Sequence, residues 1–231
     1  MNALRIAGLT VTRGAGPVIR DVDLTLEPGR ITALVGPNGA GKTSLLEAVS
    51  GVVPASAGTV HIGSDEITKQ SRVNRARRGL AHIEQGRAVF GGLTVLENLM
   101  LTARTRARVD ELFELFPELE KRRDSPAALL SGGEQQMVVL ARAFAARPSF
   151  LLIDEMSLGL APVVFTRLLP MVTRFAEEGA AILLVEQFTH LALGVASDAL
   201  VVSSGRVTYA GGAQGLLDSP GTLHSAYLGE S

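Results

Sequence analysis

One eight-residue segment, residues 36–43, constrains the fold of this chain more than any other. It reads GPNGAGKT and matches the pattern G-x-x-x-x-G-K-[ST]. An apolar run, residues 31–35, precedes it directly, and a helix-forming stretch, residues 44–49, follows it. This context predicts a buried strand, a phosphate-binding loop and a helix, which together begin an α/β fold.

The chemistry of this segment follows from its residue types. Glycines let successive backbone N–H groups turn inward around phosphate oxygens, and the helix N-terminus adds a positive dipole. Lys42 supplies a point charge for the β- and γ-phosphates, and the Thr43 hydroxyl is expected to bind Mg²⁺. The residues expected to hold the phosphates are Gly36, Pro37, Asn38, Gly39, Ala40, Gly41, Lys42, Thr43 and Ser44.

Acidic and polar residues end two further apolar runs. Residues 150–153 lead into Asp154 and Glu155, and residues 180–185 lead into Glu186 and Gln187. We expect Asp154 to bind Mg²⁺ through water, because Mg²⁺ retains much of its hydration shell. Glu155 is expected to act on the attacking water, as its general base or as the group that orients it. Three buried strands thus bring polar residues to the carboxyl edge of one sheet, where α/β proteins bind ligands.

The remaining patterns predict two further layers. Apolar and polar residues alternate through 22–26 before a Pro28-Gly29 turn, which indicates antiparallel strands within residues 4–30. Residues 94–146 are helical in pattern, and residues 199–203 and 206–210 are expected to form a hairpin. The sequence predicts one α/β domain over residues 1–231. It has a P-loop NTPase core, an N-terminal antiparallel β layer and an α-helical subdomain inserted at about 88–148.

Composition narrows the classes of partner and compartment. Lys plus Arg (22) nearly balances Asp plus Glu (23), so the basic field that attracts nucleic acid is absent, and no nucleic-acid partner is expected. The chain contains no cysteine, which excludes disulfides and fits the cytoplasm. It shows neither a signal-like N-terminus nor an apolar run of roughly 20 residues. We therefore expect a cytoplasmic protein that reaches a membrane only through a partner.

The segment LSGGEQQ, residues 130–136, is the most specific feature of the chain. Ser131 and Glu134 fit a capping box at the start of a helix. Gly132 and Gly133, which lie between these two residues, lower the stability of a helix. Glycines at this position indicate that the backbone at the start of the helix must approach an anion closely.

Two basic clusters are interpreted as solvated surface, with a specific anion site as the alternative at each. They are Arg72, Arg75, Arg77 and Arg78, and Lys121, Arg122 and Arg123.

Taken together, these motifs resemble the nucleotide-binding subunits of ATP-binding cassette (ABC) transporters over essentially the whole chain. Phosphate loop, LSGGQ-like signature and acidic strand end occur in the family's order. Gln85 matches the family's Q-loop glutamine, which implies a role at the metal and in catalysis. Residues 86–90, 157–162, 185–187 and 226–229 most resemble subunits of branched-chain amino-acid uptake systems.

The resemblance implies a function and a set of partners. Two subunits, identical or different, would close head to tail on two MgATP, each held by the phosphate loop of one chain and the signature, residues 131–134, of the other. Hydrolysis would reopen the dimer and energise import of branched-chain or related amino acids. The helical subdomain after Gln85 would pass this motion to transmembrane permease subunits at the inner face of the cell membrane, with a solute-binding protein acting indirectly.

Three positions depart from the family's pattern. Arg13 stands where an aromatic residue usually stacks on adenine, and its guanidinium either stacks on the base or is solvated. Gln187 replaces the switch histidine; its amide can donate to the γ-phosphate but does not titrate. His190 is expected on the surface of the following helix. Met156 replaces a proline and has no functional interpretation from the sequence.

Alternative functions are an ABC ATPase for another substrate or for export, and an ABC protein without transport activity. A single phosphate loop and a single signature in 231 residues disfavour ribosome- or DNA-acting members, which usually carry two cassettes or a long coiled-coil insertion. Lys42 and Glu155 disfavour a regulatory subunit that binds nucleotide without turnover.

Overall fold

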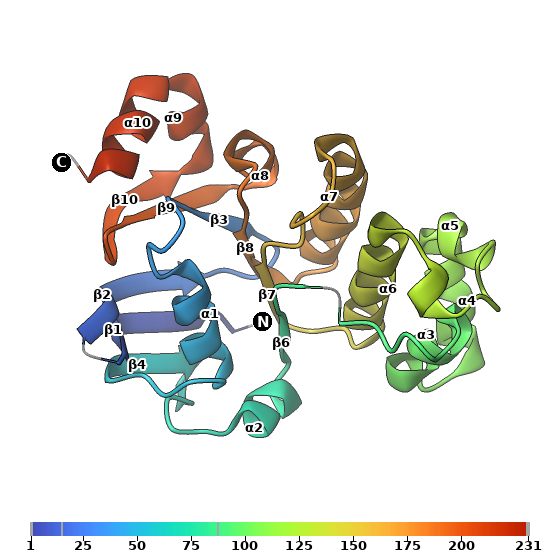
Figure 1. Ribbon diagram of the computed structural model, residues 1–231. Coiled ribbons are helices and arrows are strands. Elements are labelled where there is room, and N and C mark those ends of the chain that lie inside the picture. Colours follow the sequence, from blue (N-terminus) through green and yellow to red (C-terminus); the bar gives the residue numbers. More distant parts are fainter. Residues whose placement is uncertain (1, 15, 87, 230–231) are drawn as a thin grey trace.

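Two β-sheets organise residues 2–14, 16–86 and 88–229, the part of the chain that the computed structural model describes (Figure 1). The larger sheet has the order β10 (Arg206–Gly212), β9 (Asp198–Ser203), β3 (Ile31–Val35), β8 (Ala181–Val185), β7 (Phe150–Asp154) and β6 (Leu80–Ile83). The smaller sheet has the order β2 (Gly16–Leu26), β1 (Leu4–Arg13), β4 (Ala57–Ile62) and β5 (Asp65–Glu66). Neighbouring strands of the smaller sheet are antiparallel, whereas those from β9 to β6 are parallel. The predicted α/β core with an antiparallel layer is confirmed.

The central strands of the larger sheet are buried on both faces. Ile31, Ala33 and Val35 of β3 pack into one hydrophobic cluster, and Leu34 packs into another on the opposite face. This explains why β3, β7 and β8 are continuous apolar runs in the sequence. The register pairs Val185 with Leu34 on one side and with Asp154 on the other. The three strands therefore end at the same edge, as the sequence predicts.

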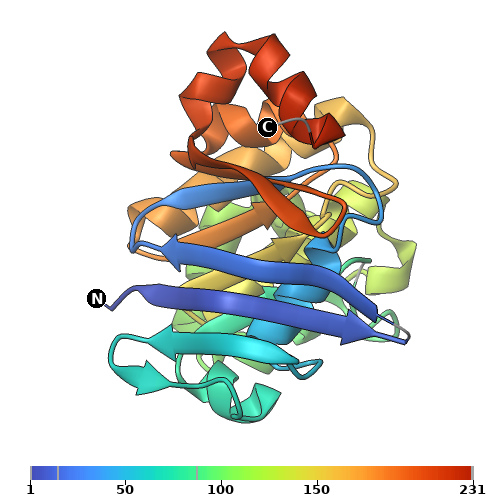
Figure 2. The same cartoon turned by 90° about the vertical axis from the view of Figure 1, so that its left-hand side faces the viewer.

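Helix α1 (Lys42–Ser50) begins inside the phosphate loop and lies between the two sheets. Its apolar side chains, including Leu45 and Leu46, share a buried cluster with Leu9 of β1 and Leu152 of β7. Figure 2 shows the antiparallel sheet as the outer wall of this half of the molecule. The packing fixes the start of α1, and with it the phosphate loop, against the main sheet.

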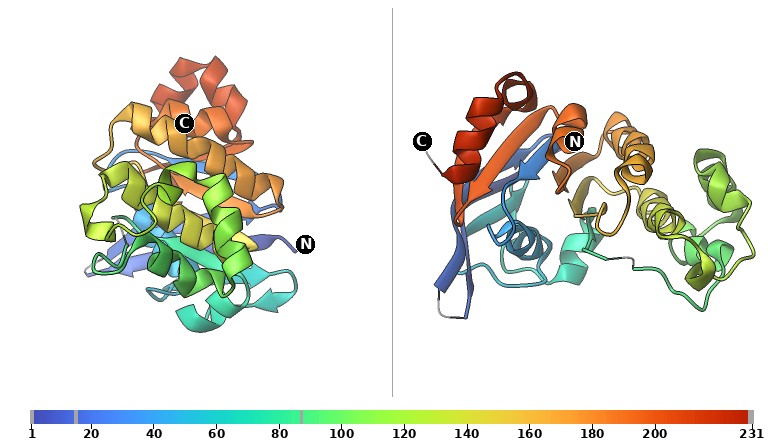
Figure 3. Two further views of the ribbon diagram at one scale, coloured as in Figure 1. Left: turned by 90° about the vertical axis from the view of Figure 1, so that its right-hand side faces the viewer. Right: turned by 45° about the horizontal axis from the view of Figure 1, so that its top comes forward.

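A helical block follows β6 and projects from the end of the molecule opposite the antiparallel sheet (Figure 3). It contains α3 (Val95–Ala103), α4 (Arg106–Leu115), α5 (Pro117–Glu120), a 3₁₀ turn (Ala127–Leu129) and α6 (Gly132–Ala145). The other helices are α2 (Arg72–Arg77), α7 (Pro162–Glu177), α8 (Thr189–Val195), α9 (Ala213–Asp218) and α10 (Pro220–Leu228). The hairpin expected near the C-terminus is β9 and β10. The inserted helical part of the predicted fold is confirmed.

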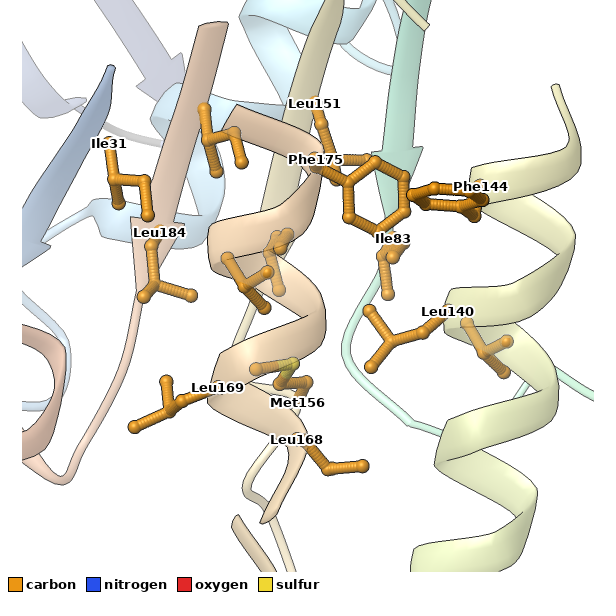
Figure 4. Close-up of a cluster of buried hydrophobic side chains, with 14 of the residues drawn as sticks. Ile31, Ile83, Leu140, Phe144, Leu151, Met156, Leu168, Leu169, Phe175 and Leu184 are labelled. Atoms are coloured by element: carbon orange, nitrogen blue, oxygen red, sulfur yellow. The ribbon is translucent and has the colours of Figure 1, made fainter. Parts of the chain in front are cut away.

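The structure gives Met156 a role in packing. Its side chain is buried in the cluster where α6 and α7 meet the main sheet, near Leu168 and Leu169 of α7 (Figure 4). In the same cluster the rings of Phe144 and Phe175 meet edge to face, with centroids 4.9 Å apart. A flexible thioether fills such an irregular space well, so Met156 anchors the turn after β7 through the core.

The basic cluster at 72–78 is expected from the sequence to be solvated surface, and for Arg75 this expectation is wrong. Arg75 is only 2% exposed. Its guanidinium donates to the carbonyls of Ala48 (2.7 Å), Val49 (2.6 Å), Thr68 (2.6 Å) and Gln70 (3.0 Å). Two of these carbonyls lie in the last turn of α1, where a helix leaves its carbonyl groups without partners and favours a cation. The side chain thus ties α2 to the helix that carries the phosphate loop. Its cluster neighbours at 72, 77 and 78 are exposed, as predicted.

Arg75→Ala is expected to lower the free energy of unfolding by about 3 kcal/mol, because buried carbonyls lose a charged donor. Urea unfolding followed by circular dichroism measures this change. The matched control is Arg77→Ala, an exposed position on the same helix, which is expected to change the free energy by about 0.5 kcal/mol or less. Equal effects of the two substitutions would contradict the capping role of Arg75.

Candidate functional site

The phosphate loop is shaped by glycines that no other residue could replace without a backbone shift. Gly36 and Gly41 have φ angles of 144° and 101°. A Cβ at Gly36 would lie 2.0 Å from the Val202 carbonyl oxygen, and one at Gly41 would lie 2.5 Å from the Val18 carbonyl oxygen. The loop is therefore wedged between β2 and β9, which sets its curvature before any ligand binds.

Lys42, the first residue of α1, is held inside this loop. Lys42 is 5% exposed, and its Nζ donates to the carbonyls of Gly36 (2.8 Å) and Pro37 (3.0 Å). Burial lowers the pKa of Lys42, while the nearby carboxyls of Glu155 and Asp154 act in the opposite direction. The ammonium group thus lies where the loop would enclose a phosphate.

Thr43 and Asp154, 111 residues apart, meet at the end of β7. The Thr43 hydroxyl donates to Asp154 Oδ1 at 3.3 Å. Burial raises the pKa of Asp154 to about 6, and the hydrogen bond from Thr43 acts against this rise. A buried carboxyl of this kind is stabilised in its charged form by a cation, and hydroxyl and carboxylate oxygens are ligands that Mg²⁺ accepts. These two residues therefore fit a magnesium site.

Within the described residues, no group of three or more His, Cys, Asp or Glu side chains could hold a metal ion by itself. Proteins commonly bind Mg²⁺ through one or two side chains together with phosphate oxygens and water.

Glu155 is held by two amides that come from separate loops. Gln85 Nε2, after β6, and Gln187 Nε2, after β8, both donate to Glu155 Oε2, at 3.1 Å and 3.0 Å. The backbone N–H of Glu155 donates to the Val185 carbonyl at 2.9 Å. Its φ of 45° lies in the left-handed region, which a non-glycine residue adopts only where its surroundings hold it there. The sheet edge thus fixes both the backbone and the carboxyl group of Glu155.

A cavity of about 350 Å³ brings these groups together. Its lining residues are Val18, Asn38, Gly39, Gly41, Lys42, Thr43, Ser44, Gln85, Glu155 and Gln187. The cavity thus joins the phosphate loop, the acidic residue after β7 and both glutamines, as the motifs suggest. None of its lining residues belongs to the signature at 131–134.

The signature begins α6 in the helical block. Its predicted capping box is confirmed: the Ser131 N–H donates to the Glu134 carboxylate at 2.8 Å, and the Glu134 N–H donates to the Ser131 hydroxyl at 3.3 Å. Ser131 is exposed and Gly132 is half-buried. Gly133 differs from the expectation of a bare backbone, because it is buried and a Cβ there would lie 2.6 Å from Val164 Cγ1 of α7. Within the signature, Gly133 alone is therefore buried, whereas Ser131, Gly132 and Glu134 are exposed or half-buried.

The structure shows the surroundings of Arg13 and His190, two further residues that the sequence analysis considered. Arg13 forms an ion pair with Glu47 of α1, and its side chain remains 44% exposed. The ion pair engages the guanidinium, for which the sequence left base stacking or solvation open. His190 is exposed on α8, as predicted. Arg87, in the segment 86–90 used for the subfamily resemblance, lies outside the described residues.

Sequence reasoning missed the environment of Glu186. This residue is 1% exposed, and its Oε2 accepts a hydrogen bond from the Ser157 hydroxyl. The available signal was its position directly after a buried strand, the same position that Asp154 and Glu155 hold at the end of β7.

A sequence model described as ABC transporter matches residues 19–157. The chain belongs to the ABC transporter family. It is 36% identical over 217 residues to the high-affinity branched-chain amino acid transport ATP-binding protein BraG of Pseudomonas aeruginosa, covering 91% of this chain and 93% of that protein. It is also 36% identical over 222 residues to the lipopolysaccharide export system ATP-binding protein LptB of Escherichia coli K12, covering 92% and 91%.

Among solved structures, the ADP conformation of an ATP-binding cassette of an ABC transporter superposes with a TM-score of 0.86 at 23% identity, covering 100% of both chains. This likeness shows the ABC cassette fold. The ABC ATPase is a nucleotide-binding enzyme whose family couples ATP hydrolysis to transport, so the predicted family, fold and enzyme class are confirmed. No helix in the described ranges is both long and apolar enough to cross a bilayer.

Proposed function

We propose that this ABC ATPase hydrolyses MgATP to energise import of branched-chain or related amino acids. ATP hydrolysis by this protein is inferred from the position of Glu155. Its carboxyl group lines the phosphate-loop cavity and accepts hydrogen bonds from Gln85 and Gln187. Residues 36–44 would bind the phosphates, with Lys42 as the point charge. Thr43, Asp154 and Gln85 would hold Mg²⁺, which neutralises phosphate charge when it is bound.

In this proposal, Glu155 accepts a proton from the attacking water or orients it. Both amides approach one oxygen of the carboxyl group, so the group has a fixed direction in the cavity. A fixed carboxylate needs little reorganisation at the moment of reaction, which favours hydrolysis over mere nucleotide binding.

The position of the signature supports action as a head-to-tail dimer. Ser131 is exposed on the helical block, and residues 131–134 do not line the cavity of their own chain. A second ABC subunit, identical or different, would place its signature over the phosphates held by the first. The helix N-terminus at Ser131 offers N–H groups and a positive dipole to the γ-phosphate.

A groove between β6, the loop after it and α6 suits the transmembrane permease subunits. It has a volume of about 510 Å³, and Gln85, Ala88 and Arg142 are among its lining residues. Since Gln85 also contacts Glu155, a partner seated in the groove would sense the state of the nucleotide site. We therefore place this protein on the inner face of the cell membrane, bound through permease subunits, with a solute-binding protein acting indirectly.

The cargo assignment rests on BraG and on a second relative, the probable branched-chain amino acid transport ATP-binding protein LivF of Archaeoglobus fulgidus, 36% identical over 211 residues. The equal identity to LptB favours export as the second candidate. Reconstitution of the protein with candidate permeases in vesicles separates the two. Uptake of leucine that depends on ATP supports the proposal, whereas ATP-dependent extraction of lipopolysaccharide with no leucine uptake contradicts it.

Gln187→Ala is expected to lower kcat for ATP hydrolysis by about 10-fold, a smaller effect than the loss of a general base. The Glu155 carboxyl group would lose one of its two amide partners, and the γ-phosphate one donor. Steady-state phosphate release measures the change, with His190→Ala on the surface of α8 as the control. Hydrolysis by Gln187→Ala at the parent rate would contradict this role.

A further inference from the structure

Glu186 is a buried acid that does not line the nucleotide cavity. Its Oε2 accepts a hydrogen bond from the Ser157 hydroxyl, and the backbone N–H groups of Ser157 and Gln187 also interact with the carboxyl group, while its Oε1 is without a hydrogen-bond partner among the described residues. Burying a carboxyl group costs free energy unless its partners compensate. The arrangement therefore calls for an explanation beyond packing.

The bond between Ser157 and Glu186 joins the two chain segments that carry groups of the proposed reaction. Ser157 lies two residues after Glu155, and Glu186 lies directly before Gln187. The same segments meet twice more, through Gln187 Nε2 on Glu155 Oε2 at 3.0 Å and through the Glu155 N–H on the Val185 carbonyl at 2.9 Å. Residues 155–157 and 185–187 thus form a closed ring that contains the Glu155 carboxyl group.

We propose that Glu186 is a positioning residue for ATP hydrolysis: through Ser157 it holds residues 155–157 against the end of β8, so that the Glu155 carboxyl group stays within reach of the Gln187 amide. This inference rests on the proposed roles of Glu155 and Gln187.

The backbone of Glu155 supports this inference independently. Its φ of 45° is a conformation that costs free energy in a non-glycine residue, and at Glu155, which is 7% exposed, packed neighbours surround it. The Val185 carbonyl holds one side of Glu155, and the bond from Ser157 to Glu186 holds the turn on the other side. Without that bond, the turn can relax and move the carboxyl group away from the cavity.

The charge state of Glu186 indicates which substitution should preserve the link. Burial raises its pKa to about 7, and the hydrogen bond from Ser157 opposes that rise. The carboxyl group is therefore largely neutral below that pH, which avoids a second charge close to Glu155. A glutamine has the same shape, is neutral, and can accept from Ser157 through its amide oxygen.

The test compares kcat and KM for MgATP in the full chain with Ser157→Ala, Glu186→Ala, both together, and Glu186→Gln. Each alanine substitution is expected to lower kcat about 10-fold with KM within about 2-fold, because transition-state geometry is lost and ATP binding is not. The double variant is expected to lie within about 2-fold of Glu186→Ala, because that substitution already removes the bond from the Ser157 hydroxyl together with the backbone contacts to the carboxyl group. Glu186→Gln is expected within about 3-fold of the parent. Glu177→Ala, an exposed acid at the end of α7, is the matched control.

Three results would overturn the inference: parent kcat in both single variants, multiplied losses in the double variant, or a Glu186→Gln variant as slow as Glu186→Ala. Thermal unfolding and nucleotide affinity check that each variant is folded. If Glu186→Ala does not fold, Ser157→Ala and Glu186→Gln carry the test. A parent as inactive as Glu155→Gln contradicts the proposed function itself, whereas an active parent with equally active variants contradicts only the role of Glu186.

Discussion

Glu155→Gln is expected to lower the ATP turnover number at least about 100-fold while leaving ATP bound, because the general base or water-orienting carboxylate is lost. The amide oxygen of glutamine can still accept from Gln85 and Gln187, so the local geometry is retained. What the variant lacks is a negatively charged oxygen that can take a proton from water. The phosphate loop and Lys42 lie on a separate element, and the hydrogen bonds from Lys42 to the carbonyls of Gly36 and Pro37 do not involve Glu155.

Steady-state phosphate release with Mg²⁺ measures the turnover, and a fluorescent nucleotide measures the affinity. The control is Glu66→Gln on β5, an exposed acid outside the cavity, which is expected to hydrolyse ATP at the parent rate. Turnover by Glu155→Gln within a few-fold of the parent would show that another group acts on the water. Loss of ATP affinity in the variant would instead assign Glu155 to binding.

Lys42→Ala is expected to raise the dissociation constant for ATP by about 10- to 100-fold, which corresponds to losing a hydrogen bond to a charged group. Lys42 is held by the carbonyls of Gly36 and Pro37, so its ammonium is already in place when the phosphates arrive. Its removal takes away the charge that balances the phosphates and the contact that keeps the loop closed. Turnover at saturating ATP is expected to fall as well, because that charge also stabilises the reacting phosphate.

The matched control for Lys42 is Lys69→Ala, an exposed lysine in the same half of the molecule. Lys42→Arg is not expected to restore affinity, since a planar guanidinium does not fit a loop built around a compact ammonium group. Circular dichroism distinguishes loss of binding from loss of folding. A folded Lys42→Ala variant with the parent's ATP affinity would contradict the assignment of residues 36–43 as the phosphate site.

The parts of the fold that could be predicted from the sequence are those with a local signal. Continuous apolar runs identify β3, β7 and β8, because a strand covered on both faces has no polar side. Fixed spacing identifies the phosphate loop, and the Ser131 and Glu134 pair identifies the start of α6. Parallel strands end at one edge, so the meeting of Thr43, Asp154 and Glu155 follows from topology.

The remaining features depend on contacts between distant segments, which leave no local pattern. Arg75 looks like its exposed neighbours in the sequence and is buried because the end of α1 packs beside it. Gly133 is enclosed by Val164 of α7, and Met156 joins a core built by α6 and α7. The bond between Ser157 and Glu186 forms because β7 and β8 are neighbours in the sheet. In each case the partner, and not the residue type, determines the role.

ATP is proposed to join two ABC subunits head to tail through the phosphate loop of one and the signature of the other, and the pair of identical chains is the form to test. Light scattering on Glu155→Gln with and without MgATP tests it most directly, because slow hydrolysis preserves the closed state. The account predicts the mass of one chain without nucleotide and of two chains with ATP, and one chain again when Ser131→Arg blocks the exposed signature. A mass of one chain at saturating ATP, or a dimer that persists with Ser131→Arg, would contradict it.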